Sequence, residues 1–388
     1  MRIEKYPLGT EKREVDGESL NSAALLPDAT GGQEQRFAAA FSLVNDAILR
    51  RSFPGAVLAV AYRGELVAHR EFGRFTYEAE ADSPLVTRET LWDLASLTKV
   101  ICTTSMAMML HERGKLDLDA RVVELLPEFD DGLDRRREAV TVRMLLAHSS
   151  GLPAHRRFYC DLAGREAITA AAMRVPLETA PMERMEYSDI GFMLLGEILQ
   201  RIARERLEEF CRREVFVPLK LNVKFGSHLS VIAGVPPTEN DTSYRNRVIR
   251  GEVHDQNTFA MGGIAPHAGL FGDALSVARF AECLVSGEHP LFRTETVRLF
   301  TTREAGPEGT SRALGWDTPS GTSQSGTKFS KRSFGHTGFT GTSVWCDAER
   351  RLSVTMLTNR TWPDALDNSI KQVRPKIHDA IVDALENR

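Results

Sequence analysis

Two residues three positions apart supply the clearest chemistry in the chain. Ser96 and Lys99 occur as Ser-Leu-Thr-Lys, just before an apolar run with helical character. If a helix begins at Ser96, residues three apart share one face, so the Lys99 amine lies beside the Ser96 hydroxyl. A serine hydroxyl attacks well when a neighbour takes its proton, and lysine does so when its pKa is lowered. The pair predicts a nucleophile and a base at a helix N-terminus, whose partial positive charge favours a developing alkoxide.

The spacing of this pair is shared by ordinary helix caps that are followed by a solvated lysine. A second Ser-x-x-Lys, at Ser325 and Lys328, lies in a Gly/Ser/Thr-rich stretch where nothing is expected to keep a lysine from water. The interpretation of the first pair therefore depends on two other segments.

The first of these segments is Tyr187-Ser188-Asp189, which stands directly before a long helical pattern. Ser188 or Asp189 fits a helix N-cap. Tyr187 is then held at the helix entrance, where a phenol can exchange protons with the serine and the leaving group. The plainer alternative is an aromatic residue at a helix interface.

The second segment runs from Phe334 to Phe339 and contains a His-Thr pair between glycines. The glycines that flank His336 and Thr337 let the backbone approach a ligand closely. The plainer alternative is a turn that feeds a strand, with an exposed histidine.

Together the three segments resemble the serine acyl-transferases that include class C β-lactamases, serine DD-peptidases, D-aminopeptidases and related esterases. The order Ser-Leu-Thr-Lys, Tyr-Ser-Asp and His-Thr-Gly is that of the family, with about ninety and then about one hundred and fifty residues between them. Flanking stretches at 141–153, 187–199, 254–272 and 335–345 also look like family sequence. The resemblance covers the chain from about residue 36 to the C-terminus.

The resemblance implies a role for each matching residue. Ser96 is expected to be the acylated nucleophile, with Lys99 and Tyr187 as the proton-transfer network. The backbone N–H groups of Ser96 and Phe339 are expected to form the oxyanion hole. The residues expected to contact substrate are Asp189, His336, Thr337 and Gly338.

Two residues depart from the pattern of β-lactamases. Asp189 stands where they carry an asparagine, and an ionised carboxylate cannot donate a hydrogen bond to a substrate carbonyl. Asp189 near Lys99 also favours the charged ammonium, which shifts the initial base role toward Tyr187. His336 replaces a lysine and is mostly neutral at pH 7, so weaker attraction for a substrate carboxylate is expected. Both changes point away from an efficient β-lactamase.

Other signals are given structural interpretations. His254-Asp255 resembles half a metal site, but no third ligand stands at a recognisable spacing, so no metal and no cofactor is predicted. The G-x-S-x-G elbow of α/β-hydrolases is absent from the sequence. His148 is interpreted as a helix C-terminal residue that satisfies carbonyls. We expect Phe339, Trp316 and Tyr159 to line an apolar pocket for the acyl group.

Composition limits the classes of partner. With 49 basic and 53 acidic residues the formal charge is −4, so the chain has no basic field for nucleic acid or an anionic membrane. The five cysteines are scattered without CxxC pairs, as expected of reduced thiols. With no long apolar run and no signal-like N-terminus, a soluble cytoplasmic protein acting on a small molecule is expected.

The elements that must position these residues come from both ends of the chain. A helix before Pro54, a β-hairpin around Arg63-Gly64, and strands at 343–348 and 352–359 are expected. The pattern of residues 365–388 predicts a helix that is interrupted at Pro375. Residues 96–260 are mainly helical in pattern, and 301–332 read as a long exposed loop near a site.

The expected fold class is α+β and class C β-lactamase-like, with an antiparallel sheet flanked by helices plus an all-helical region. Residues 1–34 are expected to form an arm or tail. Residues 35–95 and 265–388 would form the sheet domain, and 96–264 the helical domain.

The expected function is a serine hydrolase that acts on carboxylic esters or small amides through an acyl-enzyme on Ser96. One alternative is a weak β-lactamase or D-Ala-D-Ala peptidase. An alternative of another class is a catalytically inactive binding protein with the same fold.

Overall fold

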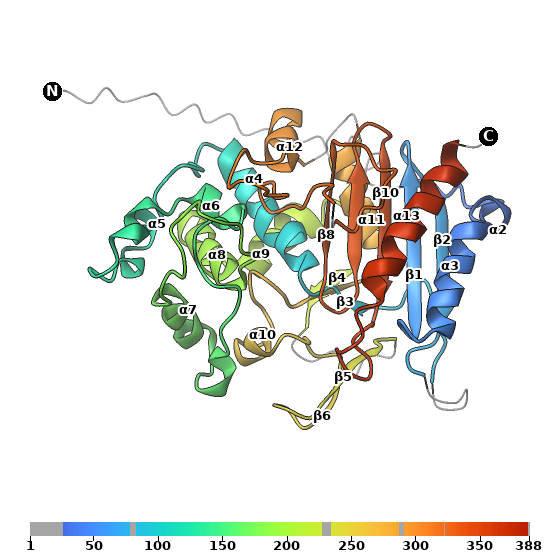
Figure 1. Ribbon diagram of the computed structural model, residues 1–388, viewed down its shortest axis with the longest axis horizontal. Helices are drawn as coiled ribbons and strands as arrows, with labels where there is room; N and C mark the ends of the chain where they lie inside the picture. Colours follow the sequence, from blue (N-terminus) through green and yellow to red (C-terminus); the bar gives the residue numbers. More distant parts are fainter. Residues whose placement is uncertain (1–25, 78–82, 227–233, 287–290, 322, 387–388) are drawn as a thin grey trace.

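A five-stranded antiparallel sheet built from both ends of the chain is the scaffold of the molecule (Figure 1). The computed structural model describes residues 26–77, 83–226, 234–286, 291–321 and 323–386. The strand order is β2-β1-β10-β9-β8. The strands are β1 (Gly55–Tyr62), β2 (Glu65–Gly73), β8 (Ser333–Thr337), β9 (Ser343–Asp347) and β10 (Leu352–Thr358).

The inner strand β1 is apolar throughout because both of its faces are covered. Successive side chains point to opposite faces, so Val57 and Ala59 enter one core while Leu58 and Val60 enter another. The predicted hairpin at residues 63–64 and the two predicted C-terminal strands are confirmed.

Helices cover the two faces of the sheet (Figure 1). Helices α3 (Ala38–Leu49) and α13 (Ile370–Glu386) pack together on one face, and α11 (Ala274–Val285) packs on the other. The expected interruption at Pro375 is wrong, because α13 continues through it. Pro375 lies in the second turn of α13 and removes one backbone hydrogen bond, and burial of Ile377 and Ile381 stabilises the helix beyond it.

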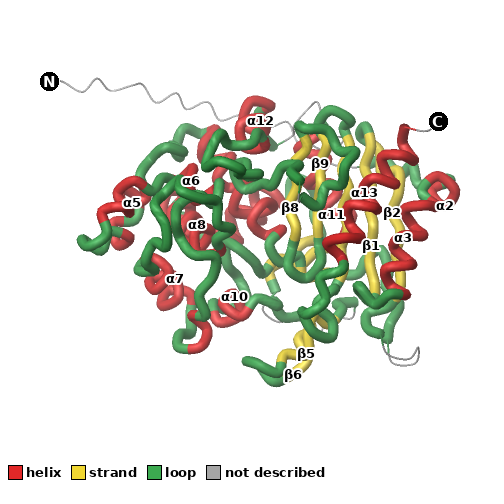
Figure 2. The backbone as a smooth tube through the Cα atoms, in the orientation of Figure 1, coloured by secondary structure: helices red, strands yellow, loops and turns green. Residues whose placement is uncertain are grey.

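The middle of the chain forms the helical part of the molecule (Figure 2). Of the described helices, none is long and apolar enough to cross a membrane. The remaining helices are α2 (Gln33–Arg36), α4 (Ser105–Glu112), α5 (Val122–Leu125), α6 (Val142–Leu146), α7 (Arg165–Met173), α8 (Asp189–Ala203), α9 (Leu207–Cys211), α10 (Gln256–Ala260) and α12 (Thr294–Thr301).

Short strands also occur within this part of the chain, where the sequence pattern is mainly helical. They form a three-stranded sheet, β3-β7-β4, and a two-stranded sheet, β5-β6. Their bounds are β3 (Trp92–Asp93), β4 (Val223–Phe225), β5 (Pro237–Asp241), β6 (Arg247–Arg250) and β7 (Leu270–Gly272). Strands of two to five residues are too short to show an alternating pattern.

Two further expectations concern the arm and the long loop. Residues 1–25 of the expected arm lie outside the described residues, while residues 26–36 pack beside β2, where Ala29 donates to the Leu66 carbonyl. The loop at 301–332 does reach the cavity described below, but it is not exposed throughout. Trp316 and Ser325 are fully buried, and Asp317 pairs with Gly335 of β8.

Candidate active site

Ser96 stands at a sharp bend between β3 and a helical run. The preceding residue, Ala95, has φ 48°, a left-handed conformation that costs an alanine roughly 1–2 kcal/mol. The buried carboxylate of Asp93 holds the bend, because it accepts hydrogen bonds from the Ala95 N–H (2.8 Å) and the His254 N–H (2.6 Å). The bend presents Ser96 at the N-terminal end of the helical run, as the sequence predicts.

Lys99 lies directly beneath Ser96 and is completely buried. Its Nζ is 3.1 Å from the Ser96 Oγ, 2.6 Å from Asp189 Oδ1 and 3.1 Å from the His267 carbonyl oxygen. The segment Lys99–Thr104 forms a π-helical turn before α4. The predicted proximity of the Ser96 hydroxyl and the Lys99 amine is confirmed.

The charge on Lys99 follows from Asp189. The three distances fit an amine as well as an ammonium, because a serine hydroxyl can either donate or accept. Burial acts to lower the pKa of Lys99, but the negative charges of Asp189 and Tyr187 outweigh burial, and the pKa is raised. Lys99 is therefore an ammonium at neutral pH and donates to the Ser96 Oγ.

Tyr187 lies beside this pair at the entrance of α8. Its hydroxyl is buried and has no hydrogen-bond partner within the described part of the chain. Lys99 Nζ is 4.9 Å from the centre of the Tyr187 ring, and the Arg312 guanidinium carbon is 5.1 Å from it. These two cations would stabilise negative charge that develops on the phenol oxygen.

His148 has a different role from the one that the sequence suggests. Its Nδ1 accepts a hydrogen bond from the Ser188 N–H (3.0 Å), so it does not satisfy helix carbonyls with that nitrogen. Its ring centre lies 4.4 Å from that of Tyr187 and 5.1 Å from that of Phe192. Burial and the charges of Arg312 and Lys99 hold the pKa of His148 well below its usual range, so this ring is a neutral support for Tyr187.

The predicted oxyanion-hole residues face the same space. The N–H groups of Ser96 and Phe339 donate to no acceptor among the described residues. The turn that carries Phe339 is tied to the segment before Ser96, because Thr342 Oγ1 donates to the Leu94 carbonyl (3.0 Å) and Thr340 Oγ1 to the Asp93 carbonyl (2.8 Å). The two amides are therefore held relative to each other by the fold, as electrostatic stabilisation of an oxyanion requires.

His336 is buried rather than exposed, and it is neutral. Its Nδ1 lies 3.0 Å from the Thr337 carbonyl oxygen. Burial and the positive charges of Lys99 and Arg312 hold its pKa well below the usual range. The expectation that His336 carries no charge at pH 7 agrees with this environment.

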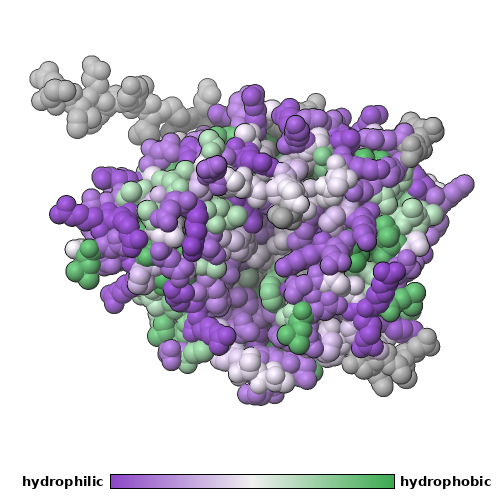
Figure 3. All heavy atoms as spheres, viewed as in Figure 1, coloured by the Kyte–Doolittle hydropathy of each residue, from purple (hydrophilic) through white to green (hydrophobic). Residues whose placement is uncertain are grey.

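A cavity of about 560 Å³ is lined by Ser96, Tyr187, His336 and Phe339, and Figure 3 shows the surface hollowed between the helical part and β8. Trp316 and Tyr159 do not line the cavity, because Trp316 packs against Phe280 and Phe334, and Tyr159 packs against Tyr244. The sequence-predicted residues that line it are Ser96, Tyr187, Asp189, His336, Thr337, Gly338 and Phe339.

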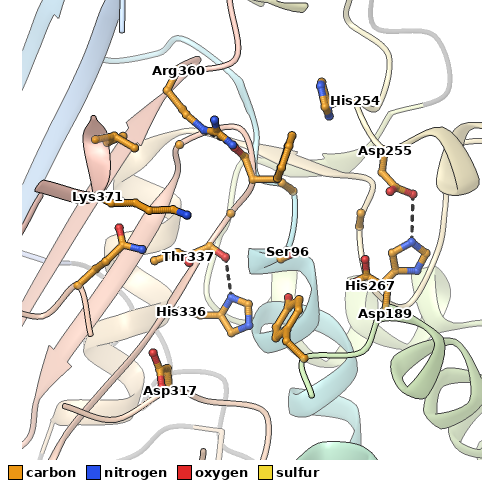
Figure 4. Close-up of a pocket in the computed structure, with 18 of the residues that line it drawn as sticks. Ser96, Asp189, His254, Asp255, His267, Asp317, His336, Thr337, Arg360 and Lys371 are labelled. Atoms are coloured by element: carbon orange, nitrogen blue, oxygen red, sulfur yellow. Dashed lines mark hydrogen bonds and ion pairs between the residues drawn. The ribbon is translucent and has the colours of Figure 1, made fainter. Parts of the chain in front are cut away.

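Several residues of the cavity were not predicted as site residues (Figure 4). Asp255 lies 3.0 Å from the His267 Nε2; burial acts to raise the Asp255 pKa, but His267 and hydrogen bonds from Thr258 hold it well below its usual range. The cavity is also lined by the basic residues Arg312, Arg360, Lys371 and Arg374. Lys371 and Arg374 are three residues apart, a helical spacing that could have revealed their common face.

Three residues of the cavity could hold a metal ion by their types. The ligand-type atoms of His155, Asp189 and Asp255 lie within 4.8 Å of one another. Both carboxylates are already engaged, Asp189 by Lys99 and Asp255 by His267. This donor set does not favour a metal ion, which would have to displace one of these partners.

The comparisons with known proteins agree with this arrangement. A family model described as beta-lactamase matches residues 34–374. The chain belongs to the β-lactamase family. An N-acetylmuramyl-L-alanine amidase of Bacillus subtilis is 31% identical over 353 residues, which cover 81% of this chain and 79% of the relative. A putative D-alanyl-D-alanine carboxypeptidase of Escherichia coli is 28% identical over 350 residues, which cover 79% of this chain and 79% of the relative.

Solved structures of other proteins share the fold. The hydrolase EstCE1, described as having promiscuous acyltransferase activity, has a TM-score of 0.71 with 21% identity over 90% of this chain and 99% of its own. Simvastatin synthase LovD from Aspergillus terreus has a TM-score of 0.71 with 21% identity over 90% and 98%. These results confirm the predicted α+β fold and the predicted class of serine hydrolase.

Proposed function

We propose that this β-lactamase-family protein hydrolyses carboxylic esters and small amides through an acyl-enzyme on Ser96. The observation that carries the proposal is the position of the Ser96 Oγ, 3.1 Å from a buried ammonium at the edge of a cavity that two unpaired backbone N–H groups also face. A hydroxyl in this setting can attack a carbonyl carbon while the N–H groups bind the developing oxyanion.

In this mechanism Tyr187 acts as a phenolate, which the neighbouring charges of Lys99 and Arg312 favour, and its oxygen takes the Ser96 proton to become a phenol. Lys99 is already protonated and donates toward Asp189, the His267 carbonyl and Ser96, so it stabilises the alkoxide rather than accepting its proton. The Tyr187 oxygen has no other partner among the described residues and can pass the proton to the leaving group. Water then attacks the acyl-enzyme by the reverse sequence of proton transfers.

A D-amino-acid peptide is the second substrate class to be tested. It is favoured by relatives named D-alanyl-D-alanine carboxypeptidase and N-acetylmuramyl-L-alanine amidase. Efficient β-lactam hydrolysis is disfavoured, since the Asp189 side chain is held by Lys99 and has no N–H to donate to the substrate.

The proposal is tested by a fluorophosphonate probe and mass spectrometry of the intact protein and its peptides. We expect one adduct, on Ser96, together with hydrolysis of p-nitrophenyl acetate. Ser96→Ala should lose both. Ser325→Ala, in the other Ser-x-x-Lys segment, should keep both, since Lys328 there is exposed and pairs with Asp383.

An unmodified Ser96 in the folded wild-type protein would overturn the proposal. That result would favour the alternative of an inactive binding protein. Undiminished ester hydrolysis by Ser96→Ala would equally exclude an acyl-enzyme at this residue.

A further inference from the structure

The ammonium of Lys99 donates to three acceptors, and one of them is a backbone carbonyl. Its Nζ lies 2.6 Å from Asp189 Oδ1, 3.1 Å from the Ser96 Oγ and 3.1 Å from the His267 carbonyl oxygen. An ammonium has three N–H donors, so these contacts use all of them. Asp189 sets the charge of Lys99 and Ser96 is the nucleophile, whereas the His267 carbonyl fixes the direction of the third donor. The aim of the ammonium at Ser96 therefore depends on what holds that carbonyl in place.

The segment that carries this carbonyl lies against the helical run of the nucleophile. Thr103 Oγ1 donates to the Pro266 carbonyl (2.6 Å), and the Leu270 N–H donates to Thr98 Oγ1 (3.1 Å). Within the described part of the chain, the His267 backbone makes no hydrogen bond besides the one to the ammonium. Backbone contacts thus hold the two ends of the segment, while the position of His267 between them depends on its side chain.

The His267 ring is buried and is held through one of its two nitrogens (Figure 4). Its Nε2 lies 3.0 Å from Asp255 Oδ1 and 3.1 Å from Thr258 Oγ1, and the same carboxylate oxygen accepts the Thr258 N–H (2.7 Å) at the start of α10. Burial acts to raise the pKa of Asp255, but His267 and the hydrogen bonds from Thr258 hold it well below its usual range, so the carboxylate is ionised. An ionised carboxylate only accepts, so the His267 Nε2 carries a hydrogen and donates it. The Nδ1 has no partner among the described residues.

We propose that His267 and Asp255 form a positioning pair, which holds the His267 carbonyl against Lys99 and thereby aims the ammonium at the Ser96 Oγ. The inference rests on the proposed function, since it assigns the pair to the acylation of Ser96. Both side chains act through Lys99, and a displacement of about 1 Å at a distance from the reacting atoms can cost about 100-fold in rate. The pair also gives a role to Asp255, whose carboxylate is engaged by His267 rather than by a metal ion.

Two substitutions of His267 distinguish its two ring nitrogens. The amide nitrogen of glutamine lies as many bonds from Cβ as the Nε2 of histidine, whereas the amide nitrogen of asparagine matches Nδ1. We expect His267→Asn to lower kcat for p-nitrophenyl acetate by about 10–100-fold, with KM within about twofold of the wild type. His267→Gln can still donate to Asp255, so its kcat should lie within about threefold of the wild type.

The pair is tested as a unit by Asp255→Ala and by the double variant that also carries His267→Asn. Each should lower kcat as much as His267→Asn alone, because all of these changes remove the same contact. The Asp255→Ala variant also supplies the test if His267→Asn does not fold. The matched control is His69→Asn, since His69 is a buried histidine of β2 that has no Nε2 partner among the described residues and does not line the cavity. This change should leave kcat unaltered.

Three results would overturn the positioning pair. The first is a folded His267→Asn variant with the activity of the wild type. The second is the reverse order, in which asparagine is active and glutamine is not, because Nδ1 would then be the working atom. The third is a double variant in which the losses of the two single changes multiply, because the two residues would then act separately.

A measurement without turnover separates failure of the pair from failure of the proposed function. In protein labelled isotopically at the lysine ε-carbon, the NMR signal of Lys99 is assigned by its absence from Lys99→Met. His267→Asn should move this signal, and His69→Asn should not. If the signal moves but wild-type protein cleaves no ester, the positioning pair stands and the proposed function is wrong. If wild-type protein cleaves the ester and His267→Asn changes neither the signal nor kcat, the pair is wrong and the proposed function stands.

Discussion

Substituting Asp189 by asparagine tests the assignment of Lys99 as an ammonium. The carboxylate oxygen is 2.6 Å from Lys99 Nζ, and the charge centres of such a pair lie about 4 Å apart. At an effective dielectric constant of about 20, the pair attraction is about 4 kcal/mol, which corresponds to about 3 pKa units. Asp189→Asn removes this attraction and leaves burial, which acts to lower the Lys99 pKa.

The pH dependence of kcat/KM for p-nitrophenyl acetate should then change in form. In the wild type the Lys99 pKa lies above 10.5, so less than about one molecule in a thousand has a free amine at pH 7.5. In Asp189→Asn the pKa of Lys99 should fall well below its wild-type value, because the attraction of the carboxylate is lost while burial still disfavours the ammonium. We expect a new acid limb in the pH profile that the wild type does not show.

Tyr187→Phe provides a second test of whether Lys99 is an ammonium that cannot accept the Ser96 proton in the wild type. In the wild type this change should reduce kcat/KM by about 10²–10⁴-fold, the usual contribution of a general base. In the Asp189→Asn background at pH 9 the loss should be smaller by about tenfold or more, because the free Lys99 amine can then accept the Ser96 proton.

Asp317→Asn is the control, since Asp317 lines the same cavity but does not contact Lys99. It should keep the wild-type pH profile, without the new acid limb. An unchanged pH profile in Asp189→Asn, or the same Tyr187→Phe loss in both backgrounds, would refute the assignment of the proton to Tyr187.

Two further predictions concern stability. Burial raises the pKa of Glu282 to about 7, so the folded protein holds its proton more tightly and stability falls as pH rises from about 4 to 7. Glu282→Gln should therefore raise the free energy of unfolding by up to about 3 kcal/mol at pH 8 and change it little at pH 4, as measured by urea denaturation; an equal change at both pH values would contradict this. In α8, a Cβ at Gly196 would overlap the Pro266 ring, whereas at Gly191 it would make ordinary contacts. Gly196→Ala should cost about 1–3 kcal/mol in urea denaturation and Gly191→Ala much less, and equal midpoints would contradict the argument.

The sheet was predictable from the sequence because its strands are long and their apolar pattern is local. The hairpin of β1 and β2 is marked by a turn at residues 63–64, and in β10 large apolar residues alternate with Ser353 and Thr355. The placement of Lys99 beside Ser96 was predictable for the same reason, since it depends only on helical spacing.

Contacts between distant segments could not be derived from local pattern. Nothing around His148 shows that its ring accepts the Ser188 N–H and supports Tyr187, because the two segments are about forty residues apart. Trp316 was expected in the cavity wall, yet its large apolar surface is better buried against Phe280 and Phe334. Packing across the core decided both positions.

The two departures from the β-lactamase pattern act together on the charge near the nucleophile. Asp189 neutralises Lys99, and buried His336 is neutral, so β8 and the residues around Ser96 contribute little net charge near the nucleophile. Because Asp189 keeps Lys99 as an ammonium, the lysine can stabilise the serine alkoxide but cannot take its proton. The proton transfer therefore falls to Tyr187, whose oxygen has no other hydrogen-bond partner among the described residues.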